Sequence, residues 1–148
     1  MNFKEKVIQA ATSALEEKIT ITQKEMQAAQ ASANEETKSS AGNKYETGRA
    51  MSQNERDRHA QKLAQLLQMK KALISIKLEP YEKVQIGSLV QTESAIYFLA
   101  TGLGIIHVEN QKVAVISAAS PVGQAIIDKK EGDKFSLMQK AELILRIE

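Results

Sequence analysis

The sequence predicts an α+β fold in two modules. Residues 1–79 are predicted to form an antiparallel coiled-coil hairpin, and residues 80–148 an antiparallel sheet with one short helix. Glycine and proline divide the chain in this way, because the first module holds two of the seven glycines and neither of the two prolines. The first module is also rich in good helix formers, whereas the second contains short β-branched runs between turn residues.

Two apolar seams predict the helices of the first module. One seam repeats at alternating spacings of three and four, as in a coiled coil; its members are Ile8, Ala11, Leu15, Ile19, Thr22, Met26, Ala29 and Ala33. The second seam comprises His59, Leu63, Leu66, Leu73 and Ile76, flanked by Leu67 and Ile74. The stretch SSAGNKYETGRA is the only plausible break between them, so the helices must run antiparallel. Helices of about 30–35 residues give a finger about 45–50 Å long, which suits reaching rather than enclosing a pocket.

Short alternating runs predict the strands of the second module. Pro80 is expected to end the second helix at Glu79, since proline disfavours helical geometry in the residue before it. Strands are expected over residues 84–90, 95–101, 105–108, 113–117, 135–138 and 142–147. In the last strand, one face is expected to carry Leu143, Leu145 and Ile147, and the other Glu142 and Arg146. Ser120 as N-cap and Pro121 at the first helical position predict the short helix.

Composition excludes several classes of protein. The chain has no cysteine, which removes disulfides, zinc–thiolate sites and thiol nucleophiles. No uncharged run reaches the roughly 20 apolar residues of a membrane span, and no targeting segment is recognisable, so we expect a cytoplasmic protein with no membrane partner. Residues 1–78 hold 13 Lys and Arg against 9 Asp and Glu, whereas residues 79–148 hold 7 against 9. The first module is therefore the one expected to meet polyanions.

The sequence offers few candidate catalytic residues. His59 and His107 lie on apolar seams and are expected to be partly buried packing residues. The stretch Thr101–Gly104 superficially suggests a phosphate loop, but it lacks a third glycine and a following helix, so a tight turn is expected. We therefore expect no active site, no cofactor of the chain's own and no small-molecule substrate.

The second module carries a specific set of motifs. It reads VQIGSLV over residues 84–90 and ISAASPVGQAIIDKKEGD over residues 116–133. This resembles the C-terminal, FKBP-like domain of the GreA/GreB transcript-cleavage factors, with the pattern V-x-x-G-S-x-V followed by I-S-x-x-S-P and G-D. The positions that match are Gly87, Ser88, Val90, Ile116, Ser117, Ser120, Pro121, Ala125, Gly132 and Asp133. The N-terminal helical hairpin also agrees, so the resemblance covers essentially the whole chain.

The resemblance implies a role in transcription regulation. Such factors dock on bacterial RNA polymerase and extend the coiled coil into its secondary channel, where acidic tip residues help to hold a second Mg²⁺ and orient water for cleavage of backtracked RNA. RNA polymerase is the implied partner, and the nascent RNA 3′ end and DNA binding are further expectations. Ser120 and Pro121 would contribute to docking, but Ala119 stands where some of these factors carry an acidic residue.

The tip motif of these factors, G-D-x-x-E, corresponds to Gly42-Asn43-Lys44-Tyr45-Glu46. Glu46 keeps the carboxylate that would share Mg²⁺, whereas Asn43 offers an amide oxygen without charge. Tyr45 could stack on a base; the cations expected to face RNA or the channel are Lys44, Arg49 and Arg56. A purely structural alternative makes Asn43 the N-cap and Glu46 the end of a capping box.

Stimulation of cleavage and simple occlusion of the channel both stay open, because the tip aspartate is replaced by Asn43. Two other functions also remain open. The hairpin could serve as a dimerisation or interaction arm unrelated to transcription. The second module could be a prolyl isomerase, although such sites are aromatic cups and residues 81–148 offer few aromatic side chains, namely Tyr81, Tyr97, Phe98 and Phe135.

Overall fold

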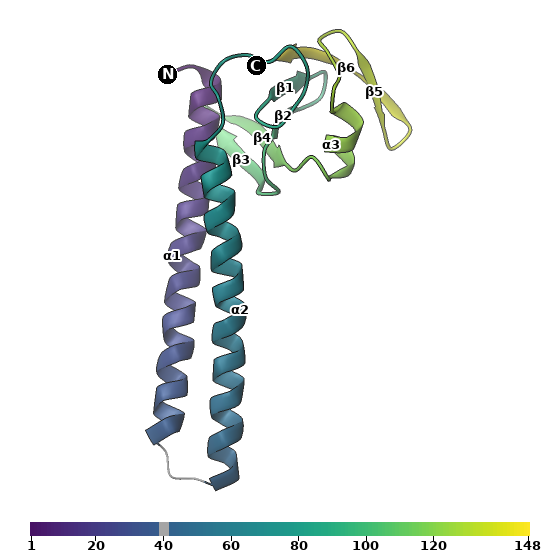
Figure 1. The fold of residues 1–148 in the computed structure, drawn as a ribbon. Helices are drawn as coiled ribbons and strands as arrows, with labels where there is room; N and C mark the ends of the chain where they lie inside the picture. Colours follow the sequence, from purple (N-terminus) through teal and green to yellow (C-terminus); the bar gives the residue numbers. More distant parts are fainter. Residues whose placement is uncertain (39–41) are drawn as a thin grey trace. The chain divides into compact units, whose positions relative to one another are not determined.

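The computed structural model describes residues 1–38 and 42–148 (Figure 1); the side chains of residues 33, 36–38, 42–47, 49 and 52 lie outside this description. Helix α1 spans Phe3–Lys38 and helix α2 spans Gly42–Ile74, and a six-stranded sheet with one short helix follows. This confirms the predicted α+β class. The contacts divide the chain into two compact units, one formed by Met1–Ala14 with Lys70–Glu148 and the other by Leu15–Met69. The domain boundary expected between residues 79 and 80 stays a prediction.

The unit Leu15–Met69 is an antiparallel helical hairpin. Arg56 of α2 donates to the Gln30 side chain of α1 at 2.9 Å, and His59 Nδ1 lies 3.7 Å from the Glu25 carboxylate. Gln30 follows Glu25 in α1, whereas its partner Arg56 precedes His59 in α2. The two helices therefore run in opposite directions. Both predicted seams contribute buried residues inside the hairpin: Leu66 comes from the second seam, and the first contributes Leu15, Ile19, Thr22 and Ala29. None of the described helices combines the length and the apolar character that a membrane span requires.

Helix α2 ends at Ile74, five residues before the predicted end at Glu79. The Ser75 hydroxyl donates to the Lys71 carbonyl at 2.8 Å, and the Ile76 amide closes a last, tighter turn on Leu73 at 3.3 Å. Serine and isoleucine are weaker helix formers than the residues before them, and a serine hydroxyl competes for backbone partners. Helix α2 therefore ends before the position at which Pro80 would have disfavoured it.

The sheet is mixed. Its strands are β1 (Leu89–Thr92), β2 (Ile96–Leu99), β3 (Gly104–Val108), β4 (Gln111–Ile116), β5 (Lys134–Leu137) and β6 (Lys140–Ile147), in the order β3-β4-β2-β1-β6-β5. Four strand pairs are antiparallel as predicted, but β2 and β4 run parallel. The chain passes through β3 before β4 returns beside β2, which reverses the direction twice and produces the parallel pair.

Strand β1 begins at Leu89 rather than at Val84. Gly87 has a φ of 102°, a left-handed conformation that only glycine adopts without strain. Next to it, the Ser88 hydroxyl accepts from the Gln85 amide at 2.9 Å, and the Ser88 amide donates to the Gln85 carbonyl at 2.9 Å. These bonds close a turn over residues 85–88, and the turn replaces the first half of the predicted strand.

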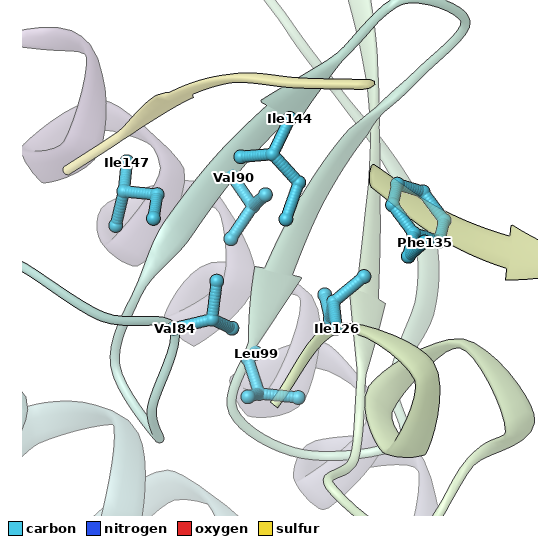
Figure 2. Close-up of a cluster of buried hydrophobic side chains, with 7 residues drawn as sticks. All are labelled: Val84, Val90, Leu99, Ile126, Phe135, Ile144 and Ile147. Carbon is cyan, nitrogen blue, oxygen red and sulfur yellow. The ribbon is translucent and has the colours of Figure 1, made fainter. Parts of the chain in front are cut away.

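The six-stranded sheet together with its short helix α3 (Pro121–Ile126) is called the sheet domain below. Figure 2 shows its core, in which side chains from several strands meet Ile126 of α3. The buried members of this cluster are Val84, Val90, Leu99, Ile126, Phe135, Ile144 and Ile147. The pairing of β1 with β6 shifts register between Gln91 and Thr92. Ile144 and Ile147 are therefore both buried, although they are three positions apart and strict alternation would put them on opposite faces.

The predicted faces of the last strand are wrong as a consequence. Leu145 is 48% exposed although it was expected to share a face with the buried Ile147, whereas Glu142, which was expected on the opposite face, is only 9% exposed. A strict alternation of faces holds only while the register is constant, and the irregularity between β1 and β6 breaks it. The strand thus carries a buried carboxylate, which is described below.

Candidate functional site

The predicted tip residues occupy the first turns of α2, which begins at Gly42. Asn43 is therefore the second residue of this helix, whereas the capping interpretation expects it immediately before the helix. The side chains on which the predicted tip functions depend lie outside the described residues; these are Asn43, Lys44, Tyr45, Glu46 and Arg49. Their roles stay predictions, and so does the Mg²⁺ assigned to Glu46.

Arg56, the remaining cation of the predicted RNA-facing set, is engaged within the hairpin. Its guanidinium donates to Gln30 at 2.9 Å and to the Asp57 carboxylate at 3.0 Å. The side chain of Arg56 is 38% exposed, and the partner Asp57 is 61% exposed. An exposed pair of this kind contributes little to stability, so the guanidinium can exchange Asp57 for another anion at small cost.

The predicted docking residues begin helix α3. Ser120 accepts a hydrogen bond from the Gly123 amide at 3.0 Å and donates to the Ser117 carbonyl at 2.7 Å, which makes it the N-cap. Pro121 occupies the first helical position, where its missing N–H is no loss. The structural prediction for both residues is confirmed. The Ser120 hydroxyl is used internally, whereas Pro121 and the neighbouring Ala119 are exposed and can meet a partner.

Gly123 explains why α3 lies so close to the segment before it. A Cβ at this position would lie 2.3 Å from the Ser117 carbonyl oxygen and 3.0 Å from backbone carbons of Ala118. Only glycine therefore lets the helix approach residues 117–118 at this distance. The sequence reasoning did not single out Gly123, although its position inside a short helix is an indication of close backbone packing.

Two further residues of the motif, Gly132 and Asp133, form a turn before strand β5. Gly132 has a φ of 86°, and its amide donates to the Ile144 carbonyl at 2.8 Å. The Asp133 carboxylate accepts from the Lys130 amide at 2.8 Å, and the Asp133 carbonyl accepts from the Ile144 amide at 2.9 Å. Gly87 and Ser88 likewise lie in a turn, the one before strand β1. Many of the matched positions therefore specify turns that connect the elements of the sheet domain.

Glu142 is a buried carboxylate that sequence reasoning missed. It accepts hydrogen bonds from the Thr92 hydroxyl at 2.7 Å, the Ser94 amide at 2.7 Å and the Ser94 hydroxyl at 2.5 Å. Burial by itself would raise the pKa of Glu142, but these hydrogen bonds and the charge of Lys140 outweigh it and lower the pKa. The carboxylate therefore fixes the turn between β1 and β2 to strand β6.

Lys4 is a second buried charge, placed in the first turn of α1. Its ammonium lies 4.5 Å from the centre of the Tyr81 ring and 3.4 Å from the Glu79 carbonyl oxygen. Burial lowers the pKa of Lys4, although the nearby carboxylates of Glu148 and Glu79 oppose the shift. The contacts lie within one compact unit and fasten the segment after α2 to the start of α1.

The histidines differ from each other. His59 is half-buried beside Glu25 as expected, whereas His107 is exposed on β3, where it pairs with Lys112. The expectation that His107 is a packing residue is wrong, because most of β3, an edge strand of the sheet, is exposed. Among the side chains that the structure describes, no three His, Asp or Glu side chains come together to hold a metal ion.

No protein-family model matches the chain, and no similar protein is found among curated sequences. Among solved structures, the chain is similar to one described as "Structure of the transcription factor Gfh1". The two share 17% sequence identity, the alignment covers 93% of each chain, and the TM-score is 0.36. A likeness of this size carries no argument about function.

Proposed function

We propose that the protein binds bacterial RNA polymerase and modulates transcription elongation through the polymerase's secondary channel. The observation that carries this proposal is the GreA/GreB-like motif set, which runs in order and at matching spacing along a chain that begins with a long helical hairpin. Helix α2 alone has 33 residues, which corresponds to about 50 Å at 1.5 Å per residue. The proposal implies a cytoplasmic protein.

Two structural features support this proposal. The matched positions Gly87, Gly132 and Ser120 are turn and cap residues of the sheet domain. The motif therefore coincides with residues that this fold requires. The seam of the hairpin in Leu15–Met69 includes the small side chains of Ala29 and Thr22, and the hollows beside it are open to solvent rather than enclosed. The hairpin is therefore better suited to contact a partner than to enclose a substrate.

In this proposal the chain is an accessory factor and the polymerase supplies the catalytic centre. Glu46 and Asn43 would present a carboxylate and an amide oxygen, donors that Mg²⁺ accepts. When bound, Mg²⁺ would stabilise the charge on phosphoryl oxygens during RNA cleavage. The single carboxylate holds a cation more weakly than a pair does. We therefore expect weak or altered cleavage, with occlusion of the channel as the alternative outcome.

A capture experiment tests the proposal. Core RNA polymerase is passed over the immobilised intact chain and over a chain that lacks residues 30–55, and the elongation rate is measured with each protein in solution. We expect both chains to retain polymerase through the sheet domain, and only the intact chain to change elongation. Failure of the intact chain to retain polymerase would overturn the proposal and favour an interaction module outside transcription.

A further inference from the structure

A cavity of about 260 Å³ lies between the sheet and the first residue of helix α1. All of the residues that line it belong to the compact unit formed by Met1–Ala14 with Lys70–Glu148. Small-molecule sites typically have volumes of about 300–1,000 Å³, so this cavity suits a ligand at the small end of that range. Its lining combines apolar side chains with two opposite charges, which together restrict the kind of ligand that fits.

Three neighbouring strands supply the floor of the cavity. Gln91 of β1 pairs with Ile96 of β2 on one side and with Arg146 of β6 on the other, so these side chains stand in one row on the same face. Leu89, two residues before Gln91, points to that face as well. Glu148 pairs with Leu89, because the Leu89 amide donates to the Glu148 carbonyl at 2.9 Å and the Glu148 amide donates back at 2.8 Å. The sheet therefore brings these side chains to one place.

Part of the cavity wall is apolar and open to water. Leu89 is buried in the floor, whereas Ile96 and Phe3 of helix α1 are only half-buried. A ligand with an apolar body would remove the exposed parts of Ile96 and Phe3 from water, which favours binding. The apolar wall therefore selects against small ligands that are polar throughout.

Two opposite charges stand side by side in the same cavity. The Arg146 guanidinium lies 2.6 Å from the Glu148 carboxylate, and the two side chains are 66% and 27% exposed. An exposed ion pair contributes little to stability, so each group can exchange its partner for a ligand at small cost. Glu148 repels an anionic ligand that approaches Arg146, and Arg146 repels a cationic ligand that approaches Glu148. A zwitterion is attracted by both groups.

We propose that this cavity binds a free α-amino acid with an apolar side chain, its carboxylate on Arg146 and its ammonium on Glu148. An α-amino acid carries both charged groups on one carbon atom, so it can reach two side chains that contact each other. Gln91, next to Arg146 in the row, can donate a further hydrogen bond to the carboxylate. The amino acid is a bound ligand and not a substrate. This inference goes beyond the proposed function and does not depend on it.

The test measures binding to the full chain without polymerase, by titration calorimetry and by the amide shifts of NMR spectra. L-Leucine should bind saturably with a Kd at or below about 1 mM and should shift the amides of Gln91, Ile96 and Arg146. Three probes each lack one feature: 4-methylpentanoate lacks the ammonium, 3-methylbutylamine lacks the carboxylate, and glycine lacks the apolar side chain. Each probe should bind about tenfold or more weakly than L-leucine, as for loss of one charged hydrogen bond or one buried side chain.

Arg146→Gln and Glu148→Gln should each weaken L-leucine binding about tenfold or more. Asp57→Asn is the matched control, because it removes an exposed arginine–carboxylate pair outside the cavity, and it should leave the Kd unchanged. All three variants should keep Tm within about 4 °C of the parent, since exposed ion pairs contribute little to stability.

Two results would overturn the amino-acid site. One is the absence of saturable binding by both L-leucine and L-phenylalanine up to about 10 mM. The other is equal affinity for L-leucine and any of the three probes, which need no variant that could misfold. Either result leaves the proposed function standing, because polymerase takes no part in the measurement.

Discussion

Replacement of Gly123 by alanine gives a direct test of how α3 is seated. The new Cβ would lie 2.3 Å from the Ser117 carbonyl oxygen, whereas ordinary contacts begin at 3.4 Å, so the backbone must separate by about 1 Å. The Ser120 hydroxyl and amide both bind that same carbonyl, at 2.7 and 3.2 Å, so the separation also strains the N-cap. Overpacking of this kind costs about 1–3 kcal/mol, and the better helix propensity of alanine returns about 1 kcal/mol.

The clash is with backbone atoms, which cannot rotate away, so the overpacking cost lies in the upper half of that range. We therefore expect Gly123→Ala to lower the free energy of unfolding by about 1–2 kcal/mol and Tm by about 2–8 °C. Thermal melting measures this change, and hydrogen exchange of the β4 amides assigns it to the sheet domain. Gly102→Ala is the control, since a Cβ on Gly102 would meet no atom within 4 Å, and the Tm of this variant should stay close to that of the parent. A Gly123→Ala protein as stable as the parent would refute the close approach of α3 to residues 117–118.

Three further variants probe the turns and the buried carboxylate. Hydrogen bonds from Thr92 and Ser94 lower the pKa of Glu142, so at acid pH the folded chain binds fewer protons than the unfolded chain, and stability is lost as pH falls through this lowered pKa. Urea titrations should therefore show a flatter acid limb for Glu142→Gln. Ser120→Ala removes an N-cap and should lower the free energy of unfolding by about 1 kcal/mol in the same titrations at neutral pH. Gly87→Ala adds a Cβ 2.9 Å from the Tyr81 hydroxyl at a left-handed φ and should lower Tm by several degrees, about 2–8 °C in a melting curve. An unchanged acid limb or an unchanged Tm would contradict the corresponding contact.

The features that the sequence predicts correctly are local. The two seams, one containing Leu15 and the other Leu66, each repeat at helical spacing, and this local pattern predicts their burial without knowledge of distant residues. The cap at Ser120 depends on residues within three positions, and so does the turn at Gly132. A short-range hydrogen-bonding pattern is sufficient to specify each of them. The α+β class follows from the same signals.

The features that sequence reasoning missed depend on distant partners. Glu142 is buried because Thr92 and Ser94, about fifty positions earlier, supply donors to its carboxylate. The parallel pairing of β2 with β4 depends on which strand β4 meets after the β3 hairpin. The periodicity of apolar residues along the sequence does not reveal the distant donors to Glu142 or the strand that lies beside β4. The tip residues illustrate the same limit, because a carboxylate at Glu46 gains its proposed role only from a partner's active centre.

RNA cleavage on a stalled, backtracked polymerase complex measures the proposed action at the active centre most directly. With the polymerase saturated by each variant, Asn43→Asp should cleave faster than the parent chain, because it restores the second carboxylate. Adding Glu46→Ala to that variant should return cleavage to the level of polymerase alone. Equal cleavage by the parent, the Asn43→Asp chain and the double variant, all bound to polymerase, would contradict a hairpin end that works at the catalytic centre.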